Sequence, residues 1–484
     1  MVLKRWLVGP ALKTTQAIHE RLSKRLALAV FASDPLSSVA YATEEILLVL
    51  ILAGTAVVHW SVTLSFIIVV LLIILTVSYR QIIYEYPAGG GAYTVSKSNL
   101  GEMPALVAAA ALTIDYILTV AVSVAAGMAA VTSALPALYP HREAIALLTI
   151  IGIVVMNLRG VRESGRVFSV PTYIFVASIF LMIGVGFFKL AAGQPVPPLP
   201  DTAPVVDGLS LFLLLRAFSS GCTALTGIET ISNGVSAFKR PESKNAAVTM
   251  IWLGGILGIM FLGITILADQ YHIMPREDET VVSQIARITF GGGVLYYLVQ
   301  ASTMAVLILA ANSAFNGYPR LASILADDGY MPHQMRSRGD RLVFSNGVII
   351  LGVVSAVLII AFKGDTHALI PLYAVGVFLS FSLAQAGMVK HWLVKRDRHW
   401  RKHLCINGLG AVTTAIATVV IASTKFLHGA WIVIGLMPVI IMWFLRVKAH
   451  YVAVNEQVAL QRDHRPPQPK RNTVIIPISG VNRA

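Results

Sequence analysis

The chain has few charged residues and almost no cysteine. Only 13% of its 484 residues are Asp, Glu, Lys or Arg, and its two cysteines are Cys222 and Cys405. This charged fraction is too small to cover the surface of a soluble protein of this size. Two cysteines in separate apolar segments support neither a disulfide framework nor a metal site.

Chemical motifs are lacking as well. The sequence contains no Walker motif, no nucleophile paired with a general base and no cluster of metal ligands, so nothing in it supports catalysis. The glycine-rich stretch 84–93 resembles no phosphate-binding loop, because no strand precedes it and no lysine closes it. The basic N-terminus does not resemble a cleavable signal peptide. We expect a protein that is not an enzyme and has no cofactor and no resident metal.

Apolar residues, by contrast, are abundant. They make up 56% of the chain, and the mean hydropathy is +0.73, which indicates an all-α integral membrane protein. Since about 20 apolar residues cross a bilayer as a helix, we predict twelve spans, near 26–54, 61–83, 103–135, 143–158, 167–192, 208–236, 246–268, 284–314, 343–362, 367–389, 404–423 and 428–445.

The basic residues predict the orientation of these spans. If the N-terminus is cytoplasmic, 31 of the 38 Lys and Arg residues fall on the cytoplasmic side and six outside, as the positive-inside rule requires. The net charge of +14 is then mostly topology and gives no reason to invoke nucleic acid. We expect a cytoplasmic segment 1–25, a transmembrane transporter domain 26–446 and a cytoplasmic tail 447–484, in the inner membrane of a bacterium.

Two cytoplasmic regions have further expectations. The loop 390–403 carries basic residues and interfacial tryptophans, so contact with anionic lipids is expected. In the tail, residues 473–480 (TVIIPISG) are typical of one buried strand. A single strand is not stable alone, so we expect the tail to hold the start of a truncated soluble domain.

Three acidic residues lie alone inside apolar stretches: Asp34, Asp115 and Glu229. An ionisable residue at bilayer depth is costly unless it is paired or hydrated, and it usually marks an ion, proton or substrate pathway. Counted at helical rise, Asp34 and Glu229 both lie about 13–15 Å from the inner face. Three acids with almost no base beside them indicate a cation.

Spans 1 and 6 are predicted to be broken. Span 1 would be about 44 Å long as one helix, and Pro35 should stop or kink it. Span 6 has the same excess length and contains Gly221 and Gly227. An offset of five spans predicts a 5+5 inverted repeat with two further helices, and paired breaks in such repeats indicate the substrate site of a secondary transporter.

Each acid also has a structural interpretation. Asp34 can cap the outer half-helix with Pro35 at its first position, although a capping carboxylate keeps lone pairs for a cation. Asp115 can anchor a neighbouring helix. Glu229 has no basic partner nearby, because Arg216 lies thirteen residues away. We therefore expect Glu229 to be neutral and protonatable.

Other candidates remain open in the same way. Glu44, Glu45 and Arg216 are expected toward the outside, where they could form an outer gate. Thr226 is equally compatible with a back-bond to its own helix. Tyr41 and Tyr373 can be aromatic packing or ion ligands.

Four sequence stretches carry a family resemblance. They are residues 31–45 (FASDPLSSVAYATEE), the YPAGGGAY stretch 86–93, Asp115–Tyr116 and 226–229 (TGIE). Together they resemble the amino acid-polyamine-organocation superfamily and, within it, the KUP-type potassium importers of the bacterial KimA branch. The resemblance implies a LeuT-like fold, potassium/proton symport, a dimer formed largely through cytosolic domains, and inhibition by cyclic di-AMP in the full-length protein.

The resemblance also implies roles for individual residues. Glu229 would be the proton-coupling carboxylate. The residues implied for potassium binding are Asp34, Tyr41, Asp115, Tyr116, Thr119, Ser123, Thr226 and Tyr373.

Three functional hypotheses remain. High-affinity potassium uptake by symport is favoured, because Asp34 and Pro35 add negative charge and remove an amide at the first break, where a permease for a carboxylate substrate needs exposed amides. A proton-coupled permease for an amino acid or polyamine is the alternative, since polyamines are also cations. A channel is disfavoured, because twin breaks suit alternating access.

Overall fold

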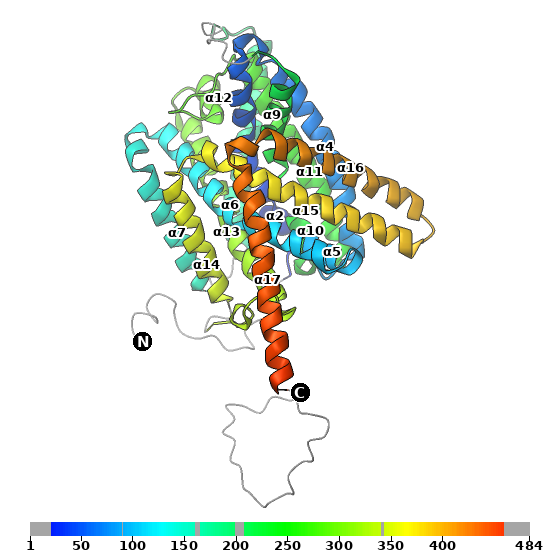
Figure 1. Ribbon diagram of the computed structural model, residues 1–484. Coiled ribbons are helices and arrows are strands. Elements are labelled where there is room, and N and C mark those ends of the chain that lie inside the picture. The colour runs from blue at the N-terminus through cyan, green and yellow to red at the C-terminus, as the bar shows by residue number, and fades with distance from the viewer. Residues whose placement is uncertain (1–20, 90, 160–164, 199–207, 340–342, 459–484) are drawn as a thin grey trace, which may run out of the picture.

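The computed structural model describes residues 21–89, 91–159, 165–198, 208–339 and 343–458, and these ranges are helical (Figure 1). The only β pairing within them is one isolated bridge, between Leu22 and Phe238. The tail strand expected at 473–480 lies outside the described residues. The α-helices are α2 (Lys24–Ser37), α3 (Ala42–Leu50), α4 (Trp60–Glu85), α5 (Ala92–Asn99), α6 (Glu102–Ala134), α7 (Arg142–Leu158), α8 (Gly165–Ala191), α9 (Leu211–Gly221), α10 (Thr230–Asn233), α11 (Glu242–Gln270), α12 (Val281–Phe290), α13 (Val294–Asp327), α14 (Ser345–Ala361), α15 (Thr366–Lys395), α16 (Trp400–Thr424) and α17 (Ala430–Val458).

Eleven helical segments of the described ranges are long and apolar enough to cross a membrane. The span predicted at 343–362 corresponds to α14, which has only 17 residues. Peripheral helices expose apolar side chains, among them Leu148 on α7, Val353 on α14 and Val419 on α16. Faces of this kind on so many helices require lipid, so the protein is a multi-pass membrane protein.

The span predicted at 284–314 is wrong in its boundaries. The structure divides this region into α12, which ends at Phe290, and α13, which begins at Val294 and continues to Asp327. Three consecutive glycines separate the two helices, and Gly291 has a φ of 68°, a conformation that other residues adopt only with strain. The prediction followed apolar character across these glycines, and this led to the error.

The α-helix of the first predicted span ends close to Pro35. It continues to Ser37, a 3₁₀ turn follows at Ser38–Ala40 and α3 begins at Ala42, so Asp34 lies inside α2 and, against the capping interpretation, does not cap the outer helix. Pro35 lacks the amide that would bond the carbonyl of Phe31, four residues earlier. That carbonyl accepts a hydrogen bond of 2.8 Å from the hydroxyl of Thr230 instead. A side chain from another segment thus replaces the missing donor, and the helix persists for one more turn.

The segment predicted as span 6 is irregular over most of its second half. After α9, residues Cys222–Leu225 form a 3₁₀ turn, Thr226 is extended, and Gly227 has a φ of 79°. The helix α10 then covers only four residues. The α-helix is therefore interrupted in both predicted spans, by a 3₁₀ turn in the first and by irregular backbone in the sixth.

The helices α6 and α13 lie side by side in the middle of the bundle, and α15 packs on both α6 and α16 (Figure 1). α6 is buried along most of its 33 residues, as expected for a helix that is apolar on all sides. Because Asp115, Thr119 and Ser123 are spaced by four residues on α6, they share one face of this central helix.

The last described helix, α17, extends beyond the rest of the bundle (Figure 1). We call the end of the bundle where it projects the lower end and the end where α12 lies the upper end. At the lower end, Lys448 on α17 donates hydrogen bonds of 2.7 Å to Glu102 on α6 and to the hydroxyl of Tyr330. Tyr451 stacks on the ring of His333, with ring centroids 3.9 Å apart. α17 is thereby tied to the lower ends of α6 and α13.

Candidate ion-binding site

The carboxylate of Asp34 lies against the backbone of Gly227, where the two interrupted segments meet. A Cβ atom on Gly227 would stand 2.7 Å from Cγ of Asp34 and 2.8 Å from its Oδ2. A second contact joins the same segments, because the hydroxyl of Ser38 donates to the carbonyl of Ala224 at 3.0 Å. Asp34 is only 7% exposed. The irregular backbone at residues 224–227 therefore packs directly against the segment that contains Asp34.

Hydroxyl groups from α6, α15 and the two interrupted segments themselves surround this point. Thr119 on α6 donates a hydrogen bond of 3.0 Å to the hydroxyl of Tyr373 on α15, and its side chain also lies beside Asp115. The hydroxyl of Tyr41 contacts Thr226, and the Thr226 hydroxyl in turn donates 2.8 Å to the carbonyl of Thr223. All of these side chains are buried. Hydroxyl and carboxylate oxygens are the ligands that suit a hard monovalent cation.

Two carboxylate oxygens in this region are buried without any partner among the described residues: Oδ1 of Asp115 and Oε2 of Glu229. The carboxylates of Asp34, Asp115 and Glu229 are also close enough to repel one another. Three mutually repelling acids cannot all be ionised in a dry interior unless a cation lies among them. The arrangement therefore calls for bound protons, a bound cation or both.

Tyr79 on α4 contributes another oxygen that the sequence did not indicate. Its ring packs edge-on against Phe381 at a centroid distance of 5.6 Å, and its buried hydroxyl has no hydrogen-bond partner in the described ranges. Glu229 and Asp115 both lie within electrostatic reach of it. The spacing of Tyr79 along α4 gave no signal, because a single tyrosine in an apolar helix is usually packing.

A cavity of about 200 Å³ reaches the region from the lower end. Tyr116 and Ser33 line its inner part, and Arg320 on α13 lines it as well. Tyr116 directly follows Asp115 in the sequence, and Ser33 directly precedes Asp34. The cavity wall therefore includes the sequence neighbours of two of the buried acids. A hydrated ion could enter or leave the site on this side.

The glycine-rich stretch after α4 forms part of the wall of this cavity. A Cβ on Gly89 would stand 2.8 Å from the carbonyl oxygen of Asn233, and one on Gly91 would stand 2.9 Å from its Oδ1. Gly89 also has a φ of 103°. Since Asn233 ends α10, the absence of side chains at these glycines lets the loop approach the end of the interrupted segment closely.

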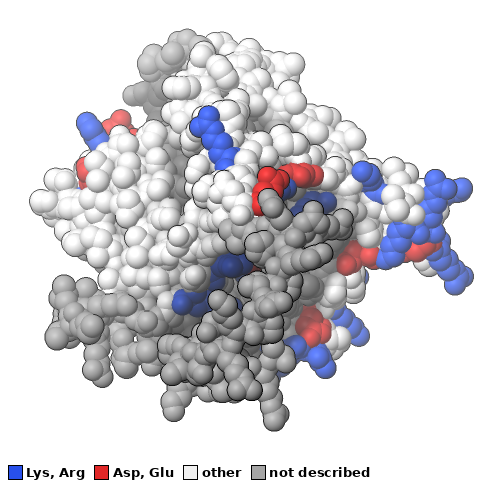
Figure 2. All heavy atoms as spheres, turned by 60° about the horizontal axis from the view of Figure 1, so that its bottom comes forward, with Lys and Arg blue, Asp and Glu red and all other residues white. Residues whose placement is uncertain are grey.

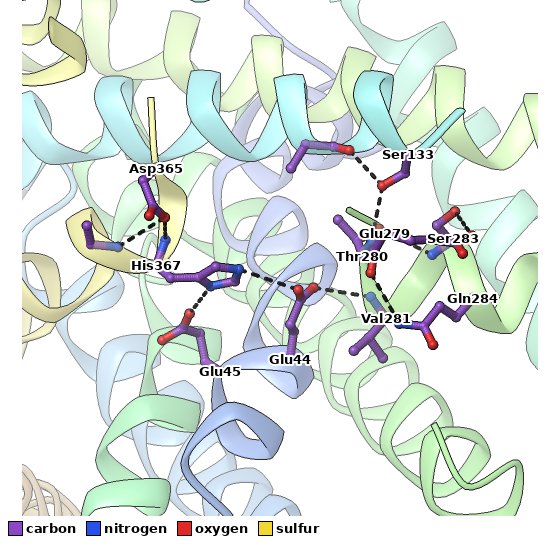
Figure 3. A network of polar contacts seen from close by, with 12 residues as sticks. Glu44, Glu45, Ser133, Glu279, Thr280, Val281, Ser283, Gln284, Asp365 and His367 are labelled. Carbon is purple, nitrogen blue, oxygen red and sulfur yellow. Dashed lines mark hydrogen bonds and ion pairs between the residues drawn. The ribbon is translucent and has the colours of Figure 1, made fainter. Parts of the chain in front are cut away.

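The upper end is closed by polar contacts (Figure 3). The imidazole of His367, at the start of α15, lies between two acids of α3, with Nδ1 at 2.7 Å from Oε1 of Glu45 and Nε2 at 3.5 Å from Oε1 of Glu44. Oε2 of Glu44 accepts a hydrogen bond of 3.2 Å from the amide of Val281, the first residue of α12. We call Glu44, His367 and Glu45 the upper triad. It joins α3, α15 and α12.

The structure thus groups most of the residues chosen from the sequence. Asp34, Tyr41, Asp115, Thr119, Thr226, Glu229 and Tyr373 lie around one buried region, with Ser123 one turn farther along α6 and Tyr116 packed against Gly317. His367, which the sequence did not single out, holds Glu44 and Glu45. Nothing in the sequence spacing relates His367 to acids more than 300 residues earlier.

Arg216, the third predicted gate residue, lies near Lys425 and His428. Lys425, between α16 and α17, is 3% exposed and its ammonium has no partner within the described part of the chain. Burial lowers the pKa of Lys425, and the charge of Arg216 acts in the same direction, whereas Glu45 opposes it. No group of three or more His, Cys, Asp or Glu side chains that could hold a metal ion occurs among the residues that the structure describes.

Comparison with known proteins supplies the family. Residues 25–445 match the amino acid permease family. The chain belongs to this family. The permease is 48% identical over 481 residues to the potassium transporter KimA of Bacillus subtilis (strain 168), an alignment that covers 99% of this chain and 79% of the relative.

More distant relatives are also transporters. The permease is 20% identical over 370 residues to the low-affinity putrescine importer PlaP of Escherichia coli (strain K12), covering 74% of this chain and 81% of that protein. A manganese transporter of Eremococcus coleocola aligns over 90% of this chain and 94% of its own, with 14% identity and a TM-score of 0.41. A superposition this loose carries no argument about function.

Proposed function

We propose that this permease imports potassium together with protons. The observation that carries the proposal is the group of three buried acids among hydroxyls, in which oxygens of Asp115 and Glu229 have no partner within the described ranges. Such a site accepts a small cation and a proton and repels anions. The 48% identity to a potassium transporter supports potassium as the cation.

We further propose that Asp34, Asp115 and the surrounding hydroxyls bind potassium, while Glu229 carries the proton. Asp34 and Asp115 lie beside the hydroxyl groups that complete an oxygen shell. Glu229 has an unpartnered oxygen and faces Asp34, with which it competes for positive charge. A proton on Glu229 removes one of the three repelling negative charges and potassium balances another, so the site carries the least net charge when both are bound. Joint binding of the two cations would couple potassium import to proton import.

Alternating access is the proposed mechanism, with a LeuT-like arrangement of two inverted five-helix repeats and two additional helices. It is supported by the interrupted segments in the first and sixth predicted spans and by the asymmetry of the two ends. A cavity lined by Ser33 and Tyr116, the sequence neighbours of Asp34 and Asp115, lies toward the lower end, whereas the upper triad joins α3 and α15 at the upper end. In this proposal the structure represents an inward-facing state, and the reverse arrangement of the two ends gives access from outside.

We propose that the lower end faces the cytoplasm of a bacterial cell and that both termini lie there. The excess of Lys and Arg in the segments assigned to that side supports this orientation. In Figure 2, in which the lower end is turned toward the viewer, basic side chains gather at the projecting connection between α15 and α16. This connection and the helix ends beside it contain Lys395, Arg396, Arg398, Arg401 and Lys402, which would meet anionic lipid headgroups there.

A polyamine permease is the second candidate, because a putrescine importer is among the relatives. Uptake of radioactive rubidium into proteoliposomes, under an inward proton gradient, distinguishes the two. Potassium should compete with rubidium, while putrescine and amino acids should not. Transport of labelled putrescine with no rubidium uptake would replace potassium by a polyamine as the substrate.

Dimer formation and inhibition by cyclic di-AMP are also proposals. They derive from the resemblance to KUP-type importers, in which cytosolic domains perform both. The alignment covers 79% of the potassium transporter that the chain matches, and each proposal is tested on the full-length gene product. Mass measurement in detergent and rubidium uptake with and without cyclic di-AMP would examine each point.

A further inference from the structure

Both ring nitrogens of His367 face a carboxylate oxygen. Nδ1 lies 2.7 Å from Glu45 and Nε2 lies 3.5 Å from Glu44 (Figure 3). The two acids are 4% and 3% exposed respectively, so water does little to screen their charges. The imidazole therefore has a buried carboxylate at each of its two polar atoms.

This geometry fixes how many protons the upper triad holds. An ionised carboxylate only accepts hydrogen bonds, and a neutral imidazole has one N–H and one lone pair. A neutral ring between two carboxylates would point its lone pair at negative charge. The arrangement is satisfied when the ring carries both protons, or when one acid is protonated. In either case the upper triad binds one proton more than the same three groups hold when separated at neutral pH.

The upper triad also connects elements that must separate for access from above. Glu44 and Glu45 begin α3, which follows the first interruption. His367 begins α15, where Asp365 caps the helix by accepting from the His367 amide at 2.9 Å. Glu44 further holds the start of α12 through Val281. Opening the upper end would break contacts of His367 with α3.

We propose that Glu44, His367 and Glu45 form a second proton-binding site, facing the outside, whose occupation closes the outer gate. The ligand is the proton itself. Because the closed arrangement contains one proton more than the open one, external acid favours closure and external alkali favours opening. The inference rests on the alternating-access function proposed above, but it concerns residues separate from Glu229 and the ion site.

Other ionisable groups face the upper triad from its surroundings. Tyr139 approaches from the connection between α6 and α7, Arg142 from the start of α7 and Asp365 from the start of α15. The connection between α11 and α12 contributes Arg276, Glu277, Asp278 and Glu279. Arg287 pairs with Glu279 at 2.9 Å. Lys425, which faces Glu45 and whose pKa burial lowers, is a group that must be tested separately.

Cysteine labelling from the outside measures the state of the gate without any transported ion. Ala125 on α6 is 1% exposed and lines the small upper cavity beside Glu44, so a cysteine there reports opening. Native Cys222 and Cys405 are replaced by serine. The labelling rate by an impermeant maleimide is divided by the rate at Gly292→Cys, in the exposed turn between α12 and α13. This ratio removes the intrinsic pH dependence of thiol reactivity.

The parent protein should show a ratio that rises by up to about tenfold per pH unit as the external pH increases from 6 to 8, the limit for release of one proton. His367→Gln removes the charge, so its ratio should be high and independent of pH. His367→Lys keeps a permanent charge, so its ratio should be low and equally flat. Opposite shifts in the two variants cannot both result from misfolding.

Two control variants should retain the slope of the parent. His59→Gln changes another histidine, at the start of α4, whose ring contacts only a carbonyl of its own segment among the described hydrogen bonds. Lys425→Met removes the second group able to titrate. If His367→Gln keeps the slope of the parent, the proposal is overturned, and if only Lys425→Met loses it, the proton belongs to Lys425. Since no substrate is required, a failure of rubidium uptake leaves this result interpretable.

Discussion

Asp34 and Gly227 lie so close that no side chain fits between them, since a Cβ on Gly227 would stand 2.7 Å from the Asp34 carboxyl carbon. The nearest backbone atom of the first interrupted segment, the nitrogen of Pro35, would be 3.0 Å away. The close packing of two segments almost 200 residues apart thus requires glycine at position 227. The proposed ion site depends on this contact.

Gly227→Ala should abolish rubidium uptake, or reduce it by at least tenfold, because the methyl group displaces Asp34 and the φ of 79° is strained for alanine. Uptake into proteoliposomes measures the effect, with reconstituted amounts checked on gels. Gly255→Ala is the matched control, since a Cβ there meets nothing within 4 Å. Equal activity of both variants would contradict the close contact.

Glu229→Gln should abolish proton-driven uptake while leaving the protein folded, because the amide keeps the shape of the acid but cannot release a proton. When the potassium concentration is equal on both sides of the vesicle membrane, exchange of rubidium for potassium needs no net proton movement. This exchange should persist at a measurable rate. Glu456→Gln, on the exposed part of α17, is the control for loss of a carboxylate. Full proton-coupled transport by Glu229→Gln would remove this residue from the mechanism.

Tyr373→Phe should weaken rubidium binding with little effect on the maximal rate. The variant loses the hydroxyl that accepts from Thr119 at 3.0 Å, and a lost hydrogen-bonding group contributes about 1 kcal/mol, equivalent to roughly a fivefold increase in KM. Thr119→Val should have a similar effect, and the double variant should be less than additive because the residues act together. Tyr84→Phe, at an exposed tyrosine, should leave KM unchanged.

Lys425→Met should stabilise the protein in detergent, because burial without a partner makes the ammonium costly. The expected gain in the free energy of unfolding is on the order of 1 kcal/mol or more. Burial lowers the pKa of Lys425 below that of the unfolded chain, so the parent regains stability as the pH rises from the folded-state pKa toward about 10.4. The advantage of the variant should therefore be largest at low pH.

Melting curves of both proteins at several pH values measure that difference. Lys189→Met, at a lysine in the last turn of α8 that is not fully buried, is the control and should show no comparable gain. If Lys425→Met lowers the melting temperature at every pH, the ammonium has a stabilising partner.

Much of the architecture could be predicted because membrane burial leaves a strong signal in composition. Isolated acids such as Asp115 stand out against apolar neighbours, and the sequence placed them at depths consistent with one another. The α-helix continues past Pro35 to Ser37 for a reason that lies far away in the sequence. Thr230 supplies the hydrogen bond that Pro35 cannot, and no local pattern indicates this.

Tertiary contacts also explain what sequence reasoning missed at the two ends. His367 follows a short polar connection, where a histidine usually indicates nothing, and its role appears only when α15 lies beside α3. Likewise, the sequence showed only that the glycine-rich stretch 84–93 resembles no phosphate-binding loop, whereas in the structure Gly89 and Gly91 leave room for Asn233. Residues whose importance depends on a distant partner cannot be identified from their own neighbours.

The hydrogen bond from Lys448 to Glu102 has a mechanical consequence. Glu102 is the first residue of α6, and Asp115 lies thirteen residues, about 20 Å, along the same continuous helix. A stiff rod transmits displacement from one end to a point farther along. A force on the projecting end of α17 is therefore passed through Lys448 to Glu102 and along α6 toward Asp115.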